Sequence, residues 1–185
     1  DKVRPVSAEH GFGVNELFDA IFESLVITKP DAKIEEGEAL KVAIVGRPNA
    51  GRSSLLNKLV GKAKTIVSEL PGTTRDAIDT AFERNDKKYL FIDTAGISRK
   101  NRIARTVEAY CVMAAIKTID NSDVTLLVID GFEGVRSQDE KIAGIIEERG
   151  KAGVIVVNKW DLVEKETATQ KLYEDRIREA MPFLS

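Results

Sequence analysis

Residues 46–53 have the composition and spacing of a phosphate-binding loop. Gly46-Arg47-Pro48-Asn49-Ala50-Gly51-Arg52-Ser53 follows an apolar run and precedes a helical pattern, which is the setting of the GxxxxGKS/T motif. Its glycines let backbone N–H groups turn toward phosphates, and the helix N-terminus adds the positive end of its dipole. The hydroxyl of Ser53 would bind Mg²⁺. The predicted phosphate-binding residues are Gly46, Asn49, Ala50, Gly51, Arg52, Ser53 and Ser54.

Arg52 stands where this motif has a lysine. A lysine ammonium is a compact charge that reaches the β- and γ-phosphates, whereas a guanidinium is planar and bulkier. Two interpretations follow from the exchange. Either Arg52 binds phosphate from a shifted position, or it weakens nucleotide binding and slows turnover. We expect binding to be retained, with Arg52 in the catalytic place of the lysine.

A second motif, Asp93-Thr94-Ala95-Gly96, follows the apolar run Leu90–Ile92. At the end of a strand, Asp93 can hold Mg²⁺ through water, and the amide of Gly96 can sense the γ-phosphate. DxxG is a frequent turn, so the assignment depends on its position between the phosphate loop and the next motif. We expect the segment Thr94–Arg105 to change conformation with the nucleotide.

The segment Ser68–Asp76 lies between these two motifs. Its Pro-Gly pair indicates a turn, and its threonine pair offers a hydroxyl to Mg²⁺ when the γ-phosphate is present. Thr74 is the predicted ligand and is counted with the catalytic residues. We expect this segment to be the second one that switches with the nucleotide.

A fourth motif, Asn158-Lys159-Trp160-Asp161, follows the apolar run Val154–Val157. The carboxylate of Asp161 can accept two hydrogen bonds from guanine, from N1–H and from the exocyclic amine. Adenine lacks this pair of donors and would leave a carboxylate unpaired, so an ATP-binding protein is disfavoured. The stem of Lys159 can lie along the plane of the base. Asn158, Lys159 and Asp161 are the predicted guanine-binding residues.

The elements that must position these residues alternate between apolar runs and helical patterns from residue 40 onward. The runs predict strands that are buried on both faces, hence a largely parallel sheet with helices on both sides, an α/β fold. The ligand is then expected at the carboxyl ends of the strands. Ser137-Gln138-Asp139-Glu140 is a predicted capping box. The predicted strands are Lys41–Val45, Leu90–Ile92, Val124–Ile129 and Val154–Val157, and the predicted helices are Arg52–Val60, Arg102–Ile119 and Ser137–Arg149.

Composition sets broad limits on what this chain does. Lys and Arg number 28 against 30 for Asp and Glu, a formal charge of -2, which gives no electrostatic reason to expect nucleic-acid or membrane binding by the whole surface. A single cysteine excludes an internal disulfide. No apolar run reaches membrane-spanning length. We expect a monomeric protein of the cytoplasm.

Together the motifs resemble the Der (EngA) family, bacterial proteins with tandem GTPase domains that act in ribosome assembly. The matching segments are GRPNAGRSSLLN at 46–57, PGTTRD at 71–76, DTAGISRK at 93–100 and NKWDLV at 158–163. The resemblance covers residues 40–185 closely and is to the second of the two domains. It implies a Ras-like P-loop GTPase fold and action on a ribosomal subunit or rRNA through the full-length protein.

Members of this family are stimulated by potassium, and an Asn of their phosphate loop helps to hold K⁺. The resemblance places Asn49 in that role, so Asn49 is predicted as a K⁺ ligand and a catalytic residue. The cation would supply charge where other GTPases use an arginine finger. Ile97 follows Gly96, where other GTPases have a glutamine that orients water. Arg52 departs from the family, in which lysine is the norm.

The resemblance also predicts the organisation of the chain. Residues 1–28 are interpreted as the last strand and helix of a preceding GTPase domain, because Ser7-Ala8-Glu9 matches the loop that backs the guanine ring. Residues 29–39 are a predicted linker, and residues 40–185 a GTPase domain whose last strand and helix are missing from the C-terminus. In the alternative, residues 1–28 dock as the last strand and helix of this same sheet. The preceding-domain interpretation is the default.

These observations predict a protein that binds GTP and GDP with Mg²⁺ and hydrolyses GTP as a switch in large-subunit assembly. The alternative is a guanine-nucleotide-binding docking module with little or no hydrolysis because of Arg52. Phosphate release at equal binding separates the two.

Overall fold

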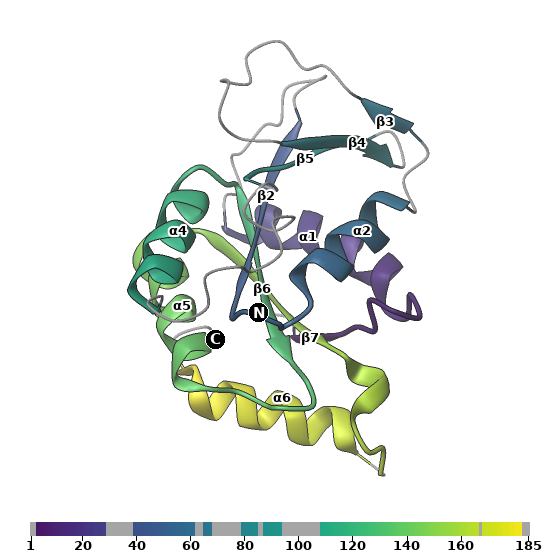
Figure 1. The fold of residues 1–185 in the computed structure, drawn as a ribbon, viewed down its shortest axis with the longest axis vertical. Helices are drawn as coiled ribbons and strands as arrows, with labels where there is room; N and C mark the ends of the chain where they lie inside the picture. Colours follow the sequence, from purple (N-terminus) through teal and green to yellow (C-terminus); the bar gives the residue numbers. More distant parts are fainter. Residues whose placement is uncertain are drawn as a thin grey trace.

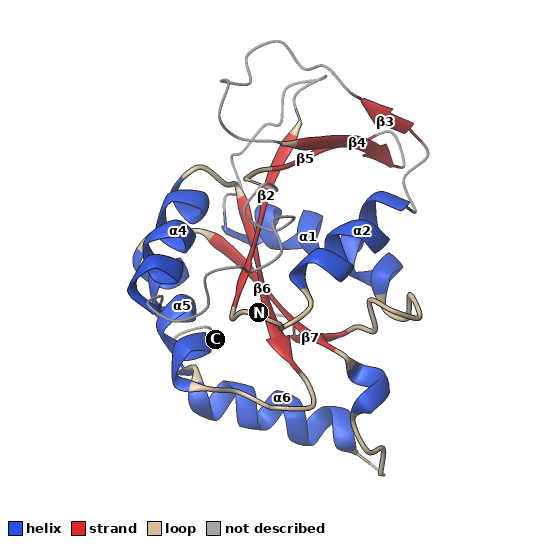
Figure 2. Cartoon of the chain, in the orientation of Figure 1, coloured by secondary structure: helices blue, strands red, loops and turns tan. Residues whose placement is uncertain are grey.

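The computed structural model describes residues 3–28, 39–61, 65–67, 79–84, 87–93, 108–166 and 168–182 of the 185-residue chain. Strands and helices alternate through most of this length (Figures 1 and 2). The strands are β1 (Val3–Pro5), β2 (Leu40–Gly46), β3 (Thr65–Val67), β4 (Thr80–Arg84), β5 (Lys87–Phe91), β6 (Val124–Asp130) and β7 (Ala152–Asn158). The helices are α1 (Val14–Thr28), α2 (Arg52–Gly61), α4 (Glu108–Asp120), α5 (Ser137–Glu148) and α6 (Thr169–Ala180), with a 3-10 turn, η1, at Trp160–Leu162.

One sheet of seven strands contains all of these strands, in the order β1-β7-β6-β2-β5-β4-β3. β1, β7, β6, β2 and β5 run parallel to one another, whereas β4 pairs antiparallel with both β5 and β3 at one end of the sheet. Every residue of β6 is buried, as expected for a strand that is covered on both faces. The predicted α/β fold with a mostly parallel sheet is therefore confirmed.

The helices form a layer on each face of the sheet, as Figure 1 shows. Along β6 successive side chains alternate between the two layers because a strand has a period of two. Leu126 and Val128 pack in the core under α1 and α2, and Leu127 and Ile129 pack in the core under α4, α5 and α6. None of the helices in the described ranges is long and apolar enough to cross a membrane.

The N-terminal segment lies in this sheet, at the edge beside β7. β1 pairs parallel with β7, and the N–H of Val6 donates to the carbonyl of Val157 (2.8 Å). On α1, Phe18 is 2% exposed and makes edge-to-face contacts with Phe82 and Tyr89 at centroid distances of 5.7 and 5.5 Å. In this chain a strand and a helix that precede the phosphate loop thus occupy the last place in the sheet.

This arrangement corresponds to the docked alternative for residues 1–28 rather than to the default. Burial drives it, because the apolar face of α1 would otherwise be exposed to water, as would the neighbouring core of β4 and β5. That residues 1–28 belong to a preceding domain in a longer protein stays a prediction, as does a further strand and helix after residue 185. Residues 29–38 of the predicted linker lie outside the described part of the chain.

The predicted elements agree with the structure in type and differ at their ends. α4 begins at Glu108, and residues 102–107 of the predicted helix lie outside the described ranges. The capping box is one position away from the prediction. The N-cap is Arg136, and the carboxylate of Asp139, rather than that of Glu140, accepts the N–H of Arg136 (3.0 Å). Ser137 is already inside the helix, so its spacing to Glu140 gave the wrong pair.

Candidate functional site

The phosphate loop joins the carboxyl end of β2 to the first turn of α2. Asn49 and Gly51 have positive φ angles of 65° and 91°, which turn the chain back toward the helix. Only glycine fits at residue 51, because a Cβ atom there would lie 2.1 Å from Nδ2 of Asn158. Gly46 is required for a similar reason, since its Cβ would lie 2.4 Å from the carbonyl oxygen of Val128. The loop therefore packs tightly against the carboxyl ends of β6 and β7.

The remaining predicted phosphate ligands follow from this turn. Ala50 is buried, and Ser53 and Ser54 are exposed on the first turn of α2. Arg52 is half-buried and is the first residue of the helix. Both Arg52 and Ser53 take part in an interaction within the protein. Their predicted contacts with phosphate and Mg²⁺ stay predictions.

Asn158, the first residue of the predicted guanine motif, connects three segments of the chain. Its side chain is buried at the end of β7, with the residue 2% exposed. Nδ2 donates to the carbonyl of Ala50 in the phosphate loop (2.9 Å), and Oδ1 accepts the N–H of Ala8 (3.0 Å). The amide thus bonds to the phosphate loop on one side and to the Ser-Ala-Glu segment on the other. This contact brings together motifs that lie 150 residues apart.

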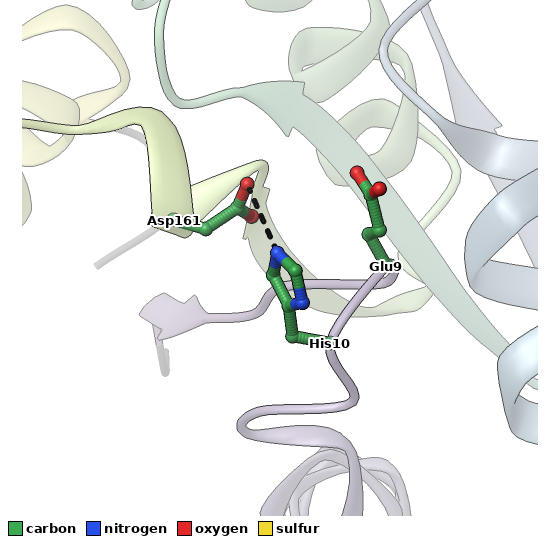
Figure 3. A group of neighbouring side chains, drawn as sticks. All are labelled: Glu9, His10 and Asp161. Atoms are coloured by element: carbon green, nitrogen blue, oxygen red, sulfur yellow. Dashed lines mark ion pairs between the residues drawn. The ribbon is translucent and has the colours of Figure 1, made fainter.

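Asp161 lies at the surface next to the N-terminal loop, as Figure 3 shows. A hydrogen bond from Ser7, followed by the charges of His10 and Lys165, holds the pKa of Asp161 below its ordinary value in spite of some desolvation. Nε2 of His10 lies 3.9 Å from Oδ2 of Asp161. Asp161 is therefore a carboxylate at neutral pH, and an ionised carboxylate is the form that can accept two hydrogen bonds.

His10 points toward Asp161, and Glu9 extends beside the pair from the same loop (Figure 3). One ligand atom from each of the three side chains lies within 4.8 Å of the others, a spacing that a metal ion could bridge. All three are at the surface, where acidic groups are common without a metal. Asp161 follows β7 in the predicted guanine motif, so binding of the base stays the role predicted for its carboxylate.

Lys159 has a left-handed backbone, with φ 58°, and its side chain reaches back to β6. Nζ donates to Oδ2 of Asp130 (2.5 Å), a carboxylate that is 5% exposed. Burial would raise the pKa of Asp130, but the hydrogen bond from Lys159 and the N–H groups of Phe132 and Glu133 lower it below its ordinary value. The ammonium thus has a partner within the protein, and the contact of the Lys159 stem with a base stays a prediction.

Asp93 follows β5 and has a φ of 53°. Its N–H donates to Oδ1 of Asp79 (2.9 Å), and its Oδ2 accepts the hydroxyl of Thr118 (3.1 Å). Because β5 and β2 are parallel neighbours, Asp93 and the phosphate loop lie at the same edge of the sheet. Mg²⁺ prefers oxygen ligands such as carboxylates and hydroxyls. Asp93 and Ser53 carry such oxygens and lie at the same edge of the sheet, as the predicted Mg²⁺ site requires.

Part of the predicted site falls outside the described residues. Thr74 and Gly96 belong to this group, as do Ile97 and the whole of the two segments that are predicted to switch. Their roles stay predictions.

Asp130, the partner of Lys159, was not among the residues that the sequence analysis placed at the site. It directly follows the apolar run Val124–Ile129, as Asp93 and Asn158 follow theirs. A polar residue at the end of a buried parallel strand was the signal that would have found it, since ligand sites gather at these ends.

Comparison with known proteins identifies the family of the chain. Residues 41–159 match the family described as 50S ribosome-binding GTPase. The chain is 50% identical over 181 residues to the protein named GTPase Der of Moorella thermoacetica, and 52% identical over 180 residues to that of Pelotomaculum thermopropionicum. These matches cover 98% and 97% of this chain but only 41% and 40% of the relatives, so the chain spans about two fifths of their length.

Among solved structures, the chain resembles Era in complex with MgGDPNP and a segment of 16S ribosomal RNA. The TM-score is 0.58 at 31% identity, and the match covers 80% of this chain and 49% of Era. The fold is thus that of a P-loop GTPase, and the resemblance to Der proteins is confirmed. With its phosphate loop and guanine motif at one edge of the sheet and a family match across more than half of its length, the chain belongs to the 50S ribosome-binding GTPase family.

Proposed function

We propose that this chain binds GTP and GDP with Mg²⁺ and hydrolyses GTP to GDP and phosphate. The observation that carries the proposal is the side chain of Asn158, which bonds to Ala50 and to Ala8. A single buried amide thereby fixes the phosphate loop, the guanine motif and the N-terminal loop relative to one another. Because these segments are already in place, less of the chain has to become ordered when a nucleotide binds, which lowers the entropic cost of binding.

In this proposal the base lies between the residues that follow β7 and the loop at residues 7–10. The carboxylate of Asp161 accepts N1–H and the exocyclic amine of guanine, and the hydrogen bond from Ser7 favours its ionised form. Adenine would offer no such pair of donors, so a complex with an adenine nucleotide would leave the carboxylate without hydrogen bonds. This loss makes the site selective for guanine.

The phosphates lie at the N-terminus of α2, within reach of the backbone of residues 49–54 and of the Arg52 guanidinium. Ser53 and Asp93 would hold Mg²⁺, with Thr74 as a further ligand in the GTP state. When bound, Mg²⁺ and K⁺ supply positive charge that stabilises the charge developing on the transferred phosphoryl group. Asn49 is the proposed K⁺ ligand.

We further propose that the protein of which this chain is a part acts on a ribosomal subunit or its rRNA. The family is described by its binding to the 50S subunit, the relatives are named GTPase Der, and the Era structure contains 16S ribosomal RNA. The nucleotide site would then act as the switch and other parts of the longer protein would supply contacts with RNA.

A second candidate is a guanine-nucleotide-binding docking module without appreciable hydrolysis. Arg52 favours it, because a guanidinium cannot occupy the place of a lysine ammonium without a shift of the loop or of the phosphates. Binding and hydrolysis are then separable properties of the same site.

Titration with fluorescent GDP, GTP and ATP in Mg²⁺, in potassium and then in sodium buffer, tests both candidates when phosphate release is followed in parallel. We expect binding that is selective for guanine and release that depends on potassium. Selective binding without release would support the docking module. Equal binding of ATP and GTP would refute the assignment of Asp161, and absence of all nucleotide binding would refute both candidates.

A further inference from the structure

Arg47 belongs to the phosphate loop, but all three of its guanidinium nitrogens bond to residues outside the loop. Nε donates to Oδ2 of Asp139 (2.8 Å), Nη1 to Oε2 of Glu133 (2.8 Å) and Nη2 to the carbonyl of Gly134 (3.2 Å). The side chain is 13% exposed. A planar guanidinium that donates one hydrogen bond from each of its three nitrogens is fixed in orientation as well as in position.

Asp139 is the deeply buried partner in this network, with a side chain that is 0% exposed. Burial raises its pKa, and the N–H of Arg136 and the charge of Arg47 oppose that rise. Its Oδ1 has no hydrogen-bond partner among the residues that the structure describes. A buried carboxylate that loses its cation is strongly unfavourable, so Asp139 and Arg47 hold each other in place.

The loop between β6 and α5 is hydrogen-bonded at its start to the guanine motif and at its end to Arg47 of the phosphate loop. At its start, Lys159 bonds to Asp130, and the N–H of Gly131 donates to the carbonyl of Asn158 (2.8 Å). At its end, Arg47 bonds to Gly134 and Asp139. The route from the phosphate loop to the guanine motif through this loop is separate from the direct bond between Asn158 and Ala50.

We propose that Arg47 is a positioning residue that holds the phosphate loop in its nucleotide-binding conformation through Asp139 and Glu133. The inference rests on the proposed function. Arg47 itself is fully engaged with the loop that precedes α5, so it acts on the nucleotide only through the backbone that it anchors. Without this anchor the first half of the phosphate loop is free to move away from the phosphates, and bound GDP leaves faster.

The test compares GDP binding by the unchanged chain with binding by Arg47→Met, Asp139→Asn and the double variant. Arg149→Met is the matched control, because Nη1 of Arg149 donates to both carboxylate oxygens of Asp120 at the other end of α5 (2.8 and 2.9 Å). Dissociation of fluorescent GDP gives the off-rate, titration gives Kd, and circular dichroism without nucleotide identifies a temperature at which every variant is folded.

We expect Arg47→Met to raise the Kd for GDP by about tenfold, equal to about 1.4 kcal/mol, mainly through a faster off-rate. Arg149→Met should leave the Kd unchanged. In the double variant the loss should be smaller than the sum of the two single losses, because the neutral amide that replaces the Asp139 carboxylate needs no cation. An ion pair that matters only for the stability of the fold would show no such coupling in GDP affinity.

An Arg47→Met variant that is folded and binds GDP as tightly as the unchanged chain would overturn the inference, while the proposed function would stand. Strict additivity of Arg47→Met and Asp139→Asn in GDP affinity would overturn it as well. If Arg47→Met does not fold, Arg47→Lys and Glu133→Gln take its place, and an unchanged Kd in both overturns the inference. Failure of the unchanged chain to bind GDP would refute the proposed function and this inference with it.

Discussion

Replacement of Phe18 by alanine tests whether the N-terminal helix is part of this domain. Phe18 is 2% exposed, contacts Phe82 and Tyr89 edge to face, and carries the guanidinium of Arg84 4.4 Å from its ring centroid. A Phe→Ala change in a core costs about 3–5 kcal/mol, which includes the cavity that remains. A domain of this kind is stabilised by about 5–15 kcal/mol in total, so the expected loss is a large part of its stability.

Unfolding by urea, followed by circular dichroism, measures this loss. Phe12→Ala is the matched control, because Phe12 lies on the same segment and is 58% exposed; a surface change of this kind is expected to alter stability by less than about 0.5 kcal/mol. GDP affinity should also fall for Phe18→Ala, since a loosened α1 carries Ala8 away from Asn158. Equal and small effects of the two substitutions on stability would refute the packing of residues 3–28 on this sheet.

Three further predictions concern the site. Asp161→Asn should shift nucleotide preference from guanine toward xanthine by at least about a hundredfold, measured by competition between GDP and XDP; retained preference for GDP would contradict the assignment. Gly51→Ala should abolish GDP binding, because its Cβ would meet Nδ2 of Asn158 at 2.1 Å and the residue has a φ of 91°; titration with fluorescent GDP is the check, and unchanged affinity would refute the close packing described. The pKa of Asp130 is lowered in the folded chain, so the ionised carboxylate contributes to stability at neutral pH. This contribution is lost as the pH falls through the lowered pKa. Lys159→Met removes the hydrogen bond and the charge that lower the pKa of Asp130. The variant's urea midpoint should therefore fall less than that of the unchanged chain as the pH is lowered through the ordinary range of an aspartate carboxyl, about 4; parallel pH profiles would contradict this.

Features that depend on neighbouring residues could be predicted from the sequence. The phosphate loop and the guanine motif each follow an apolar run that the structure shows as a strand, β2 and β7, because strand burial and turn chemistry are written in consecutive residues. Parallel strands bring their carboxyl ends to one edge, so the convergence of Asp93, Asn158 and the loop at residues 46–53 also followed.

Contacts between distant residues could not be predicted in the same way. The choice between a tail and a docked edge strand for residues 1–28 depends on how well Phe18 fits between β4 and β5, which no local pattern records. The partner of Arg47 was likewise hidden, because Asp139 lies 92 residues away and the predicted cap gave the neighbouring Glu140 its role. In both cases the deciding term is desolvation of a particular pair of groups, and this is a property of the packed structure.

The pairing of β1 with β7 has a consequence for the order in which this chain folds during synthesis. Ala8 leaves the ribosome long before its partner Asn158, which follows 150 residues later. At a synthesis rate of about 5–20 residues per second, the N-terminal strand waits roughly 8–30 s for the edge on which it docks. Until β7 has emerged, the apolar face of α1 lacks its native partners on that strand. The guanine site can form only after β7 has emerged, so nucleotide binding would report the completion of the sheet.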